Sequence, residues 1–283
     1  MVMLDSEIRL PAQREVSILT TADPSWLPRV AEVVIRPDKY GLKTVLLQSG
    51  DGPYVLGIGY YVGKSGPEIQ RLINHQKGRP LDQLIALGIP RVEMSLWVAP
   101  SQRPLVEKLV SVLSNEVFGV IAQANPILPD WMTNFDIFHG VREKLMVWCD
   151  KTDTGPTAQL FTYIRNELRL PPDEFTMLFT SANLHRRGTQ TRFAGAYKQL
   201  GDKDDIAYAV MDVHEDEYQK GSPPIISMLP FTIGHNRLLA LKARRGTDDL
   251  QLRLTELEVR SKFGMIAYSI GVVGHRFLHP RAA

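Results

Sequence analysis

Short apolar runs alternate with amphipathic segments along most of this chain, and this alternation constrains its fold more than any other feature. The runs are typical of buried strands, whereas the amphipathic segments carry apolar residues at the spacing of a helix face. Strands are predicted at residues 16–19, 29–35, 44–47, 54–62, 91–98, 145–148, 175–180, 206–211, 224–229 and 238–243, and helices at 66–76, 101–112, 157–168 and 193–200. Because strands and helices interleave, the sequence predicts an α/β fold with a mixed sheet.

Composition is that of an ordinary globular protein and excludes several classes. The chain has 283 residues, of which 44% are hydrophobic, so it can bury a core without disulfides. A formal net charge of +2 is too small to indicate nucleic-acid binding by itself. Cys149 is the single cysteine, which excludes a disulfide framework and a cysteine-built zinc site. No apolar stretch is long enough to span a membrane, so we expect a cytoplasmic protein without a membrane partner.

No shift in composition marks a clear domain boundary. Residues 1–28 contain several prolines and are predicted to form an irregular N-terminal lead-in with one short strand. The α/β domain is expected to occupy residues 29–245. Residues 246–283 are expected to form a C-terminal extension that packs on the same domain.

A short basic segment, residues 76–82, follows the first predicted helix. Lys77 and Arg79 lie two residues apart, and Pro80 closes the segment. A helix C-terminus favours cations, so these two residues can be explained as a helix end alone. An arginine fork also binds carboxylate or phosphate with two hydrogen bonds, and lysine adds a point charge. Residue type and spacing leave both interpretations open.

A second polar segment follows the strand predicted at residues 175–180. Ser181 and Asn183 have the same spacing as the two basic residues and offer a hydroxyl and an amide. Ligands in open α/β sheets usually bind at the carboxyl ends of strands. The two segments together therefore predict an anion-binding site, and the alternative is a solvated basic face beside a turn. Further cations follow in the sequence at Arg186, Arg187 and Arg192.

The familiar catalytic motifs are absent from the sequence. It contains no His-Glu-x-x-His, Gly-x-Ser-x-Gly, Walker A or Cys-x-x-Cys motif, and no metal-ligand set is predicted. Gly57-Ile58-Gly59 is only the start of a dinucleotide-binding fingerprint, and it lies in a predicted strand rather than at a helix entry. Such glycines allow another group to approach the strand backbone closely.

These segments, in this order, resemble motifs of the YrdC family. Residues 77–81 resemble its Lys-x-Arg motif, and residues 180–184 resemble its Ser-x-Asn motif. Gly57 and Gly59, which follow Tyr54, resemble the end of its Val-Tyr-Gly-Leu-Gly strand.

Two further segments extend the resemblance, which covers roughly residues 30–245. Residues 145–150 lie where the family has a Val-Arg-Val-Pro strand. Residues 221–227, followed by 237–239, resemble its Ser-Thr-Val-Val-Asp strand and the arginine-bearing segment after it.

The resemblance implies a single twisted mixed β-sheet with flanking helices and a basic concave face. Proteins of the YrdC family combine L-threonine, bicarbonate and ATP into threonylcarbamoyl-adenylate, release pyrophosphate, and so supply N6-threonylcarbamoyladenosine formation on tRNA. Attack of the carbamate on the α-phosphorus needs no protein nucleophile, so positioning and charge neutralisation carry the catalysis. The implied activity is that of a nucleotidyltransferase. The implied ligands are ATP, Mg²⁺ and a small amino acid, with tRNA or another RNA as a further partner.

The resemblance also implies roles for individual residues. Lys77 and Arg79 would be catalytic, and no residue is assigned to a metal. The implied nucleotide- and substrate-binding residues are Ser181, Asn183, Gly57, Gly59, Arg186 and Ser222.

The sequence departs from the family where the family holds its amino acid. Residues 49–53 replace the family's Pro-Thr-Asp-Thr, and Trp148 replaces the arginine of Val-Arg-Val-Pro. His185 and Arg186 replace a small Ser-Gly, and the Trp-Pro-Gly-Pro segment is absent. The phosphate-handling motifs are therefore matched, and the amino-acid pocket is not.

Three hypotheses follow from these observations. The chain is an enzyme that forms a carbamoyl-adenylate, with threonine or another amino acid as substrate. Alternatively, it is a non-catalytic protein of the same fold that binds a nucleotide or RNA. In the third hypothesis it is an unrelated α/β protein, and the motifs coincide by chance.

Overall fold

The computed structural model describes residues 16–49, 53–113, 118–137, 139–148, 155–185, 187, 190–201, 203, 205–214, 223–233, 236–242 and 268–269. The predictions made for Cys149, Arg186, Ser222 and nearly all of residues 246–283 lie outside this part of the chain.

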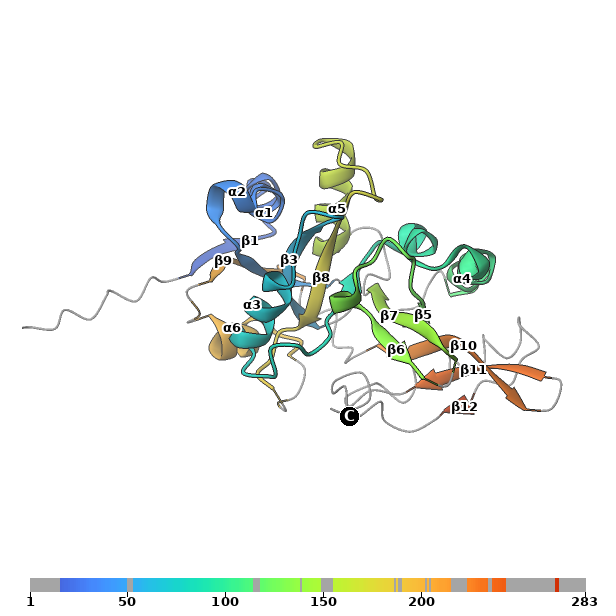
Figure 1. Ribbon diagram of the computed structural model, residues 1–283. Helices are drawn as coiled ribbons and strands as arrows, with labels where there is room; N and C mark the ends of the chain where they lie inside the picture. The colour runs from blue at the N-terminus through green and yellow to red at the C-terminus, as the bar shows by residue number, and fades with distance from the viewer. Residues whose placement is uncertain are drawn as a thin grey trace, which may run out of the picture.

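Strands and helices interleave through the described part of the chain (Figure 1). The strands are β1 (Ser17–Thr20), β2 (Thr44–Gln48), β3 (Tyr54–Tyr61), β4 (Ala86–Gly88), β5 (Phe118–Gln123), β6 (Asn134–Asp136), β7 (Val141–Trp148), β8 (Phe175–Ser181), β9 (Ile206–Met211), β10 (Ile225–Ile233), β11 (Asn236–Lys242) and β12 (Tyr268–Ser269). The α-helices are α1 (Trp26–Ile35), α2 (Pro37–Tyr40), α3 (Glu68–Gln76), α4 (Arg103–Val112), α5 (Pro156–Asn166) and α6 (Phe193–Leu200). The 3₁₀ helices are η1 (Arg91–Trp97), η2 (Pro100–Gln102) and η3 (Asp130–Met132).

All described strands belong to one mixed sheet, which confirms the predicted fold class. The strand order is β1-β9-β2-β3-β8-β4-β7-β5-β10-β11-β12, and β6 pairs with β7 outside this path. Strands β1 and β2 both pair with β9 in parallel, whereas β3 is antiparallel to both β2 and β8. The antiparallel β3–β8 pair brings the end of β8 next to the start of β3, where Val55 lies opposite Ser181.

Helices cover both faces of the sheet at β3. Figure 1 shows α1, α2 and α5 on one side of the sheet, and α3 and α6 on the other. Side chains alternate between these faces along the strand, so Tyr54 packs its ring against Phe193 of α6. Gly59 has the opposite orientation and lies against the carbonyl of Val34 in α1. The core therefore has two layers, one on each side of the strand.

The prediction of a strand at residues 29–35 is wrong, because this segment belongs to helix α1. Its apolar residues alternate loosely, but the helix buries Trp26, Val30, Val33 and Val34, which follow the helical spacing of i, i+4, i+7 and i+8. Helix α1 also crosses the boundary predicted between residues 28 and 29. Packing against α5 and the sheet favours the helix over the strand.

The prediction of a strand at residues 91–98 is also wrong, because most of this segment forms the 3₁₀ helix η1. Met94 and Trp97 are buried, whereas Val92 is 83% exposed. A 3₁₀ helix has three residues per turn, so residues 94 and 97 share one face. The alternation of apolar residues in this segment does not correspond to alternating burial.

The close contact at Gly59 supplies a stability prediction. A Cβ atom added there would lie 2.0 Å from the Val34 carbonyl oxygen, which is backbone and cannot rotate away. Gly59→Ala should lower the free energy of unfolding by about 1–3 kcal/mol, measured by urea unfolding. Gly57→Ala is the matched control, because its nearest neighbours are side-chain atoms of Phe179 and Met177, at 2.9 and 3.0 Å. Equal losses in both variants would contradict the backbone clash.

Candidate functional site

The two predicted anion-binding segments meet at the C-terminal end of helix α3. Lys77 directly follows the helix and is only 3% exposed. Its Nζ lies 3.2 Å from Thr180 Oγ1, and 3.4 Å from both Ser181 Oγ and Asn183 Oδ1. It also donates a hydrogen bond to the Ser181 carbonyl. The structure therefore brings together residues that are far apart in the sequence.

Arg79 joins the same group of side chains. Its Nη2 donates to Thr180 Oγ1 over 3.1 Å, and its Nε donates to Asn74 Oδ1 over 2.6 Å. The Thr180 hydroxyl therefore accepts from both Lys77 and Arg79. Sequence reasoning included Thr180 in the second motif without giving it a role, and it gave no signal for Asn74. We call Lys77, Arg79, Thr180, Ser181 and Asn183 the Lys77 cluster.

Backbone hydrogen bonds place the end of β8 against the end of α3. Ala182 N donates to the Tyr54 carbonyl over 2.7 Å, which extends the β3–β8 pairing. His185 N donates to the Lys77 carbonyl over 3.0 Å. The Nδ2 of Asn183 donates to the carbonyls of Leu184 and Arg187, while its Oδ1 faces Lys77. Asn183 thus shapes the turn after β8 and orients the lysine.

The contacts of Lys77 within the cluster orient its charge. Two hydroxyls, one carbonyl and one amide oxygen surround the ammonium, and all four are neutral acceptors. These contacts satisfy its hydrogen-bonding groups and fix the position of its charge. Arg79, Thr180 and Ser181 are half-buried, so they form the accessible part of the cluster. The arrangement suits a small anion held by Arg79 and Ser181 above a fixed positive charge.

Of the described residues, Gly57 and Gly59 were also assigned from the sequence, and they do not join the cluster. Gly57 and Gly59 lie inside β3, and their Cβ positions face Phe179 and helix α1. Thr180 is paired with Leu56, so its side chain is on the opposite face of the sheet. The close approach expected at these glycines is therefore made by protein atoms. Their contact with a nucleotide stays a prediction.

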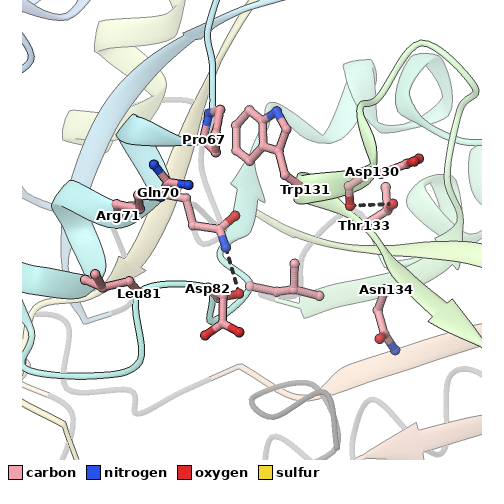
Figure 2. A pocket seen from close by; sticks show the side chains of 10 residues that line it. Pro67, Gln70, Arg71, Leu81, Asp82, Asp130, Trp131, Thr133 and Asn134 are labelled. Atoms are coloured by element: carbon pink, nitrogen blue, oxygen red, sulfur yellow. Dashed lines mark hydrogen bonds between the residues drawn. The ribbon is translucent and has the colours of Figure 1, made fainter. Parts of the chain in front are cut away.

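A cavity is lined in part by the loop that follows Arg79. It has a volume of about 270 Å³, and its lining comes from α3, residues 81–84 and the segment from η3 to β6 (Figure 2). Its lining includes the charged residues Arg71, Asp82 and Asp130, and the indole of Trp131. The sequence gave no signal for a cavity here, because the lining residues come from separate segments of the chain.

A buried lysine ties two walls of this cavity together. Lys144 on β7 is 3% exposed, and its Nζ donates to the carbonyls of Ile85 and Met132, each over 2.6 Å. Ile85 follows the cavity residue Leu84, and Met132 directly follows Trp131. Burial lowers the pKa of the Lys144 ammonium to about 7, because the charged form loses its hydration.

Neither a metal centre nor a membrane span is found among the described residues. No group of three or more His, Cys, Asp or Glu side chains in this part of the chain is arranged to hold a metal ion. None of the helices found there is both long and apolar enough to cross a bilayer.

Comparison with known proteins shows the fold. No protein-family model matches the chain, and no curated protein matches it. The crystal structure of P. abyssi Sua5 complexed with L-threonine superposes with a TM-score of 0.59 at 13% identity, over 90% of this chain and 63% of that one. The fold of this chain is YrdC/Sua5-like.

A second structure gives the same result. A doubly substituted P. abyssi Sua5 superposes with a TM-score of 0.60 at 13% identity, over 89% of this chain and 65% of that one. This chain therefore spans less than two thirds of the length of either Sua5 structure. The resemblance to the YrdC family is confirmed for the fold.

Lys144 supplies a prediction for the pH dependence of stability. Its pKa is about 7 in the folded protein, against an ordinary value of 10.5, so between these values only the unfolded chain binds the proton. The free energy of unfolding should therefore rise with pH, by up to roughly 1.4 kcal/mol per unit, relative to Lys144→Met. Urea unfolding of both proteins between pH 7 and pH 10 measures this difference. If the difference in the free energy of unfolding between the two proteins stays constant with pH, the pKa of Lys144 is not lowered by folding.

Proposed function

We propose that this chain is a nucleotidyltransferase that forms a carbamoyl-adenylate from ATP, bicarbonate and a small amino acid. The observation that supports the proposal is the convergence of Lys77 and Arg79 on Thr180 and Ser181 within a YrdC/Sua5-like fold. A fixed ammonium, a guanidinium fork and a hydroxyl are groups that bind phosphate and carboxylate.

The proposed reaction has two steps. The amino nitrogen of the amino acid first forms a bond to the carbon of bicarbonate, and water leaves, which gives the carbamate. The second step is a substitution at the α-phosphorus of ATP. The carbamate oxygen forms the new bond to phosphorus, the bond to the β-phosphate oxygen breaks, and pyrophosphate leaves. Arg79 would contact the phosphate oxygens, and Lys77 would supply a positive charge beneath them. Ser181 and Asn183 would orient the bound group, and Arg186 and Ser222 are further expected contacts. Mg²⁺ is expected to enter bound to the nucleotide's phosphates, because it usually binds through one or two carboxylates together with substrate phosphates.

Pyrophosphate release tests this proposal. The protein, ATP, Mg²⁺, bicarbonate and each of a panel of amino acids, including L-threonine, should yield pyrophosphate and an adenylate detectable by mass spectrometry. Lys77→Met and Arg79→Gln should each lower the rate by roughly a hundredfold. Each removes a positive charge from the place where negative charge develops on the phosphate oxygens. Arg79→Lys should fall between Arg79→Gln and the unchanged protein, because it keeps the charge and loses the fork.

Controls separate catalysis from folding. Lys198→Met is the matched control, since Lys198 is exposed on α6 outside the cluster. Thermal unfolding shows whether each variant is folded, which matters for the buried Lys77. The proposal would be rejected if no amino acid yields either pyrophosphate or an adenylate. An unchanged rate in both Lys77→Met and Arg79→Gln would also reject it.

A second candidate function is non-catalytic binding of RNA or a nucleotide. It is favoured by the exposed side chains of Arg187 and Arg192 in the segment that leads from the Lys77 cluster to α6. Cations in such a position suit a phosphate backbone rather than a single small anion.

Salt dependence tests the RNA alternative. The affinity for tRNA should fall steeply as salt rises, because binding releases condensed counterions. Arg187→Gln and Arg192→Gln should each reduce the slope of log K against log salt by about one. Arg169→Gln, at an exposed position after α5, is the control and should leave the slope unchanged. An affinity for tRNA that does not vary with salt would exclude this candidate.

A further inference from the structure

Asn74 on helix α3 holds the guanidinium of Arg79. The Asn74 side chain is fully buried, and its Oδ1 accepts a hydrogen bond from Arg79 Nε over 2.6 Å. The Asn74 backbone carbonyl also accepts from Arg79 N over 3.1 Å. Two hydrogen bonds therefore join the same two residues, one at the backbone and one at the guanidinium. Because Asn74 is fully buried, it does not touch a ligand itself and acts only through its neighbours.

The surroundings of the Asn74 amide determine which of its ends faces Arg79. Its Nδ2 donates to the carbonyls of Leu81 and Gln83, over 3.0 and 2.7 Å, which uses both amide hydrogens. A reversed amide would place its oxygen against these two carbonyl oxygens, and an N–H group against the Nε–H of Arg79. The amide oxygen is therefore fixed toward the guanidinium.

A left-handed residue at the end of α3 brings Arg79 back to the helix. Gly78 has a φ of 62°, and its N–H donates to the His75 carbonyl over 3.0 Å. Glycine adopts this conformation without steric cost, so the chain reverses directly after Lys77. Arg79 Nη2 then donates to Thr180 Oγ1 over 3.1 Å. Acceptors on α3 and on β8 thus hold two nitrogen atoms of the guanidinium, which fixes its plane.

We propose that Asn74 is a positioning residue for the Lys77 cluster, because it fixes Arg79 in the orientation that binds a phosphate group. A second arginine in this chain has a carboxylate partner instead. Arg165 donates from Nε and Nη2 to the two carboxylate oxygens of Glu93, each over 2.8 Å, so a negative charge of the fold matches its positive charge. Asn74 supplies an acceptor without a negative charge, so it holds Arg79 without repelling an anion.

The inference rests on one part of the proposed function, the binding of phosphate by Arg79, and it does not require adenylate formation. Inorganic pyrophosphate is the product released in the proposed reaction, so it is a probe that needs neither ATP nor an amino acid. Its binding to the full chain is measured by calorimetry at low ionic strength, where the attraction between charges is least screened.

The alternative is that Asn74 only holds the loop of residues 81–83, and Gln70 is the matched control for that role. Gln70 lies one turn earlier on α3, is 5% exposed, and donates from Nε2 to the Asp82 carbonyl over 2.8 Å (Figure 2). It supports the same loop, and within the described part of the chain it forms no hydrogen bond with Arg79. Gln70→Leu should therefore change the affinity for pyrophosphate by no more than about twofold.

A double-mutant cycle with Arg79 separates positioning from support of the fold. Asn74→Leu should weaken pyrophosphate binding roughly tenfold, because it removes a hydrogen bond to a charged group. In the Arg79→Gln background the same substitution should weaken binding by no more than about twofold, since the residue that Asn74 positions is gone. Thermal unfolding shows whether each protein is folded.

The inference is overturned if Asn74→Leu weakens binding equally in both backgrounds, or if Gln70→Leu weakens it as much. It is also overturned if pyrophosphate does not bind the unchanged protein. Where Asn74→Leu does not fold, Asn74→Asp takes its place, because it keeps the shape and the acceptor and adds a negative charge beside Arg79. Asn74→Asp should weaken binding roughly tenfold or more, and an unchanged affinity would overturn the inference.

The same measurements distinguish this inference from the proposed function. A cycle that behaves as expected, without pyrophosphate release from ATP, would reject the proposed function alone. The inference alone would be rejected if Arg79→Gln abolishes pyrophosphate release, while Asn74→Leu weakens pyrophosphate binding equally in both backgrounds.

Discussion

The candidate site depends on the hydrogen bonds that hold the buried ammonium of Lys77. A buried charge destabilises the fold unless hydrogen bonds replace its lost hydration. Here the oxygens of Thr180, Ser181 and Asn183 do so, and they all come from the end of β8 and the turn that follows. The end of α3 and the end of β8 therefore have to stay together. That requirement also places the Arg79 guanidinium beside the same hydroxyl.

Much of the fold followed from local patterns, and the failures have a common cause. The strands predicted at residues 44–47 and 206–211 and the helix at 193–200 are confirmed, because their apolar spacing agrees with how they are buried. Residues 29–35 and 91–98 also alternate, yet they form α1 and η1. Short apolar runs fit more than one periodicity, so packing against neighbouring segments decides between them.

The cavity and its support had no sequence signal. Arg71, Asp82 and Trp131 come from three separate segments, and no local spacing relates them. The same holds for Lys144, which in the sequence is an ordinary charged residue before an apolar run. The pairing of β7 with β4 and with β6 brings its side chain to the carbonyls of Ile85 and Met132. Burial there lowers the pKa of the Lys144 ammonium.

The fold class, most of the strands and helices, and the residue types that converge at the Lys77 cluster could be predicted from local sequence. These features depend on apolar periodicity and on motifs a few residues long. Which charges are buried, which are accessible, and where a cavity with charged lining residues forms beside α3 could be known only from the tertiary structure. Those properties depend on strand register and helix packing, which join residues far apart in the chain, and local sequence carries little information about such contacts.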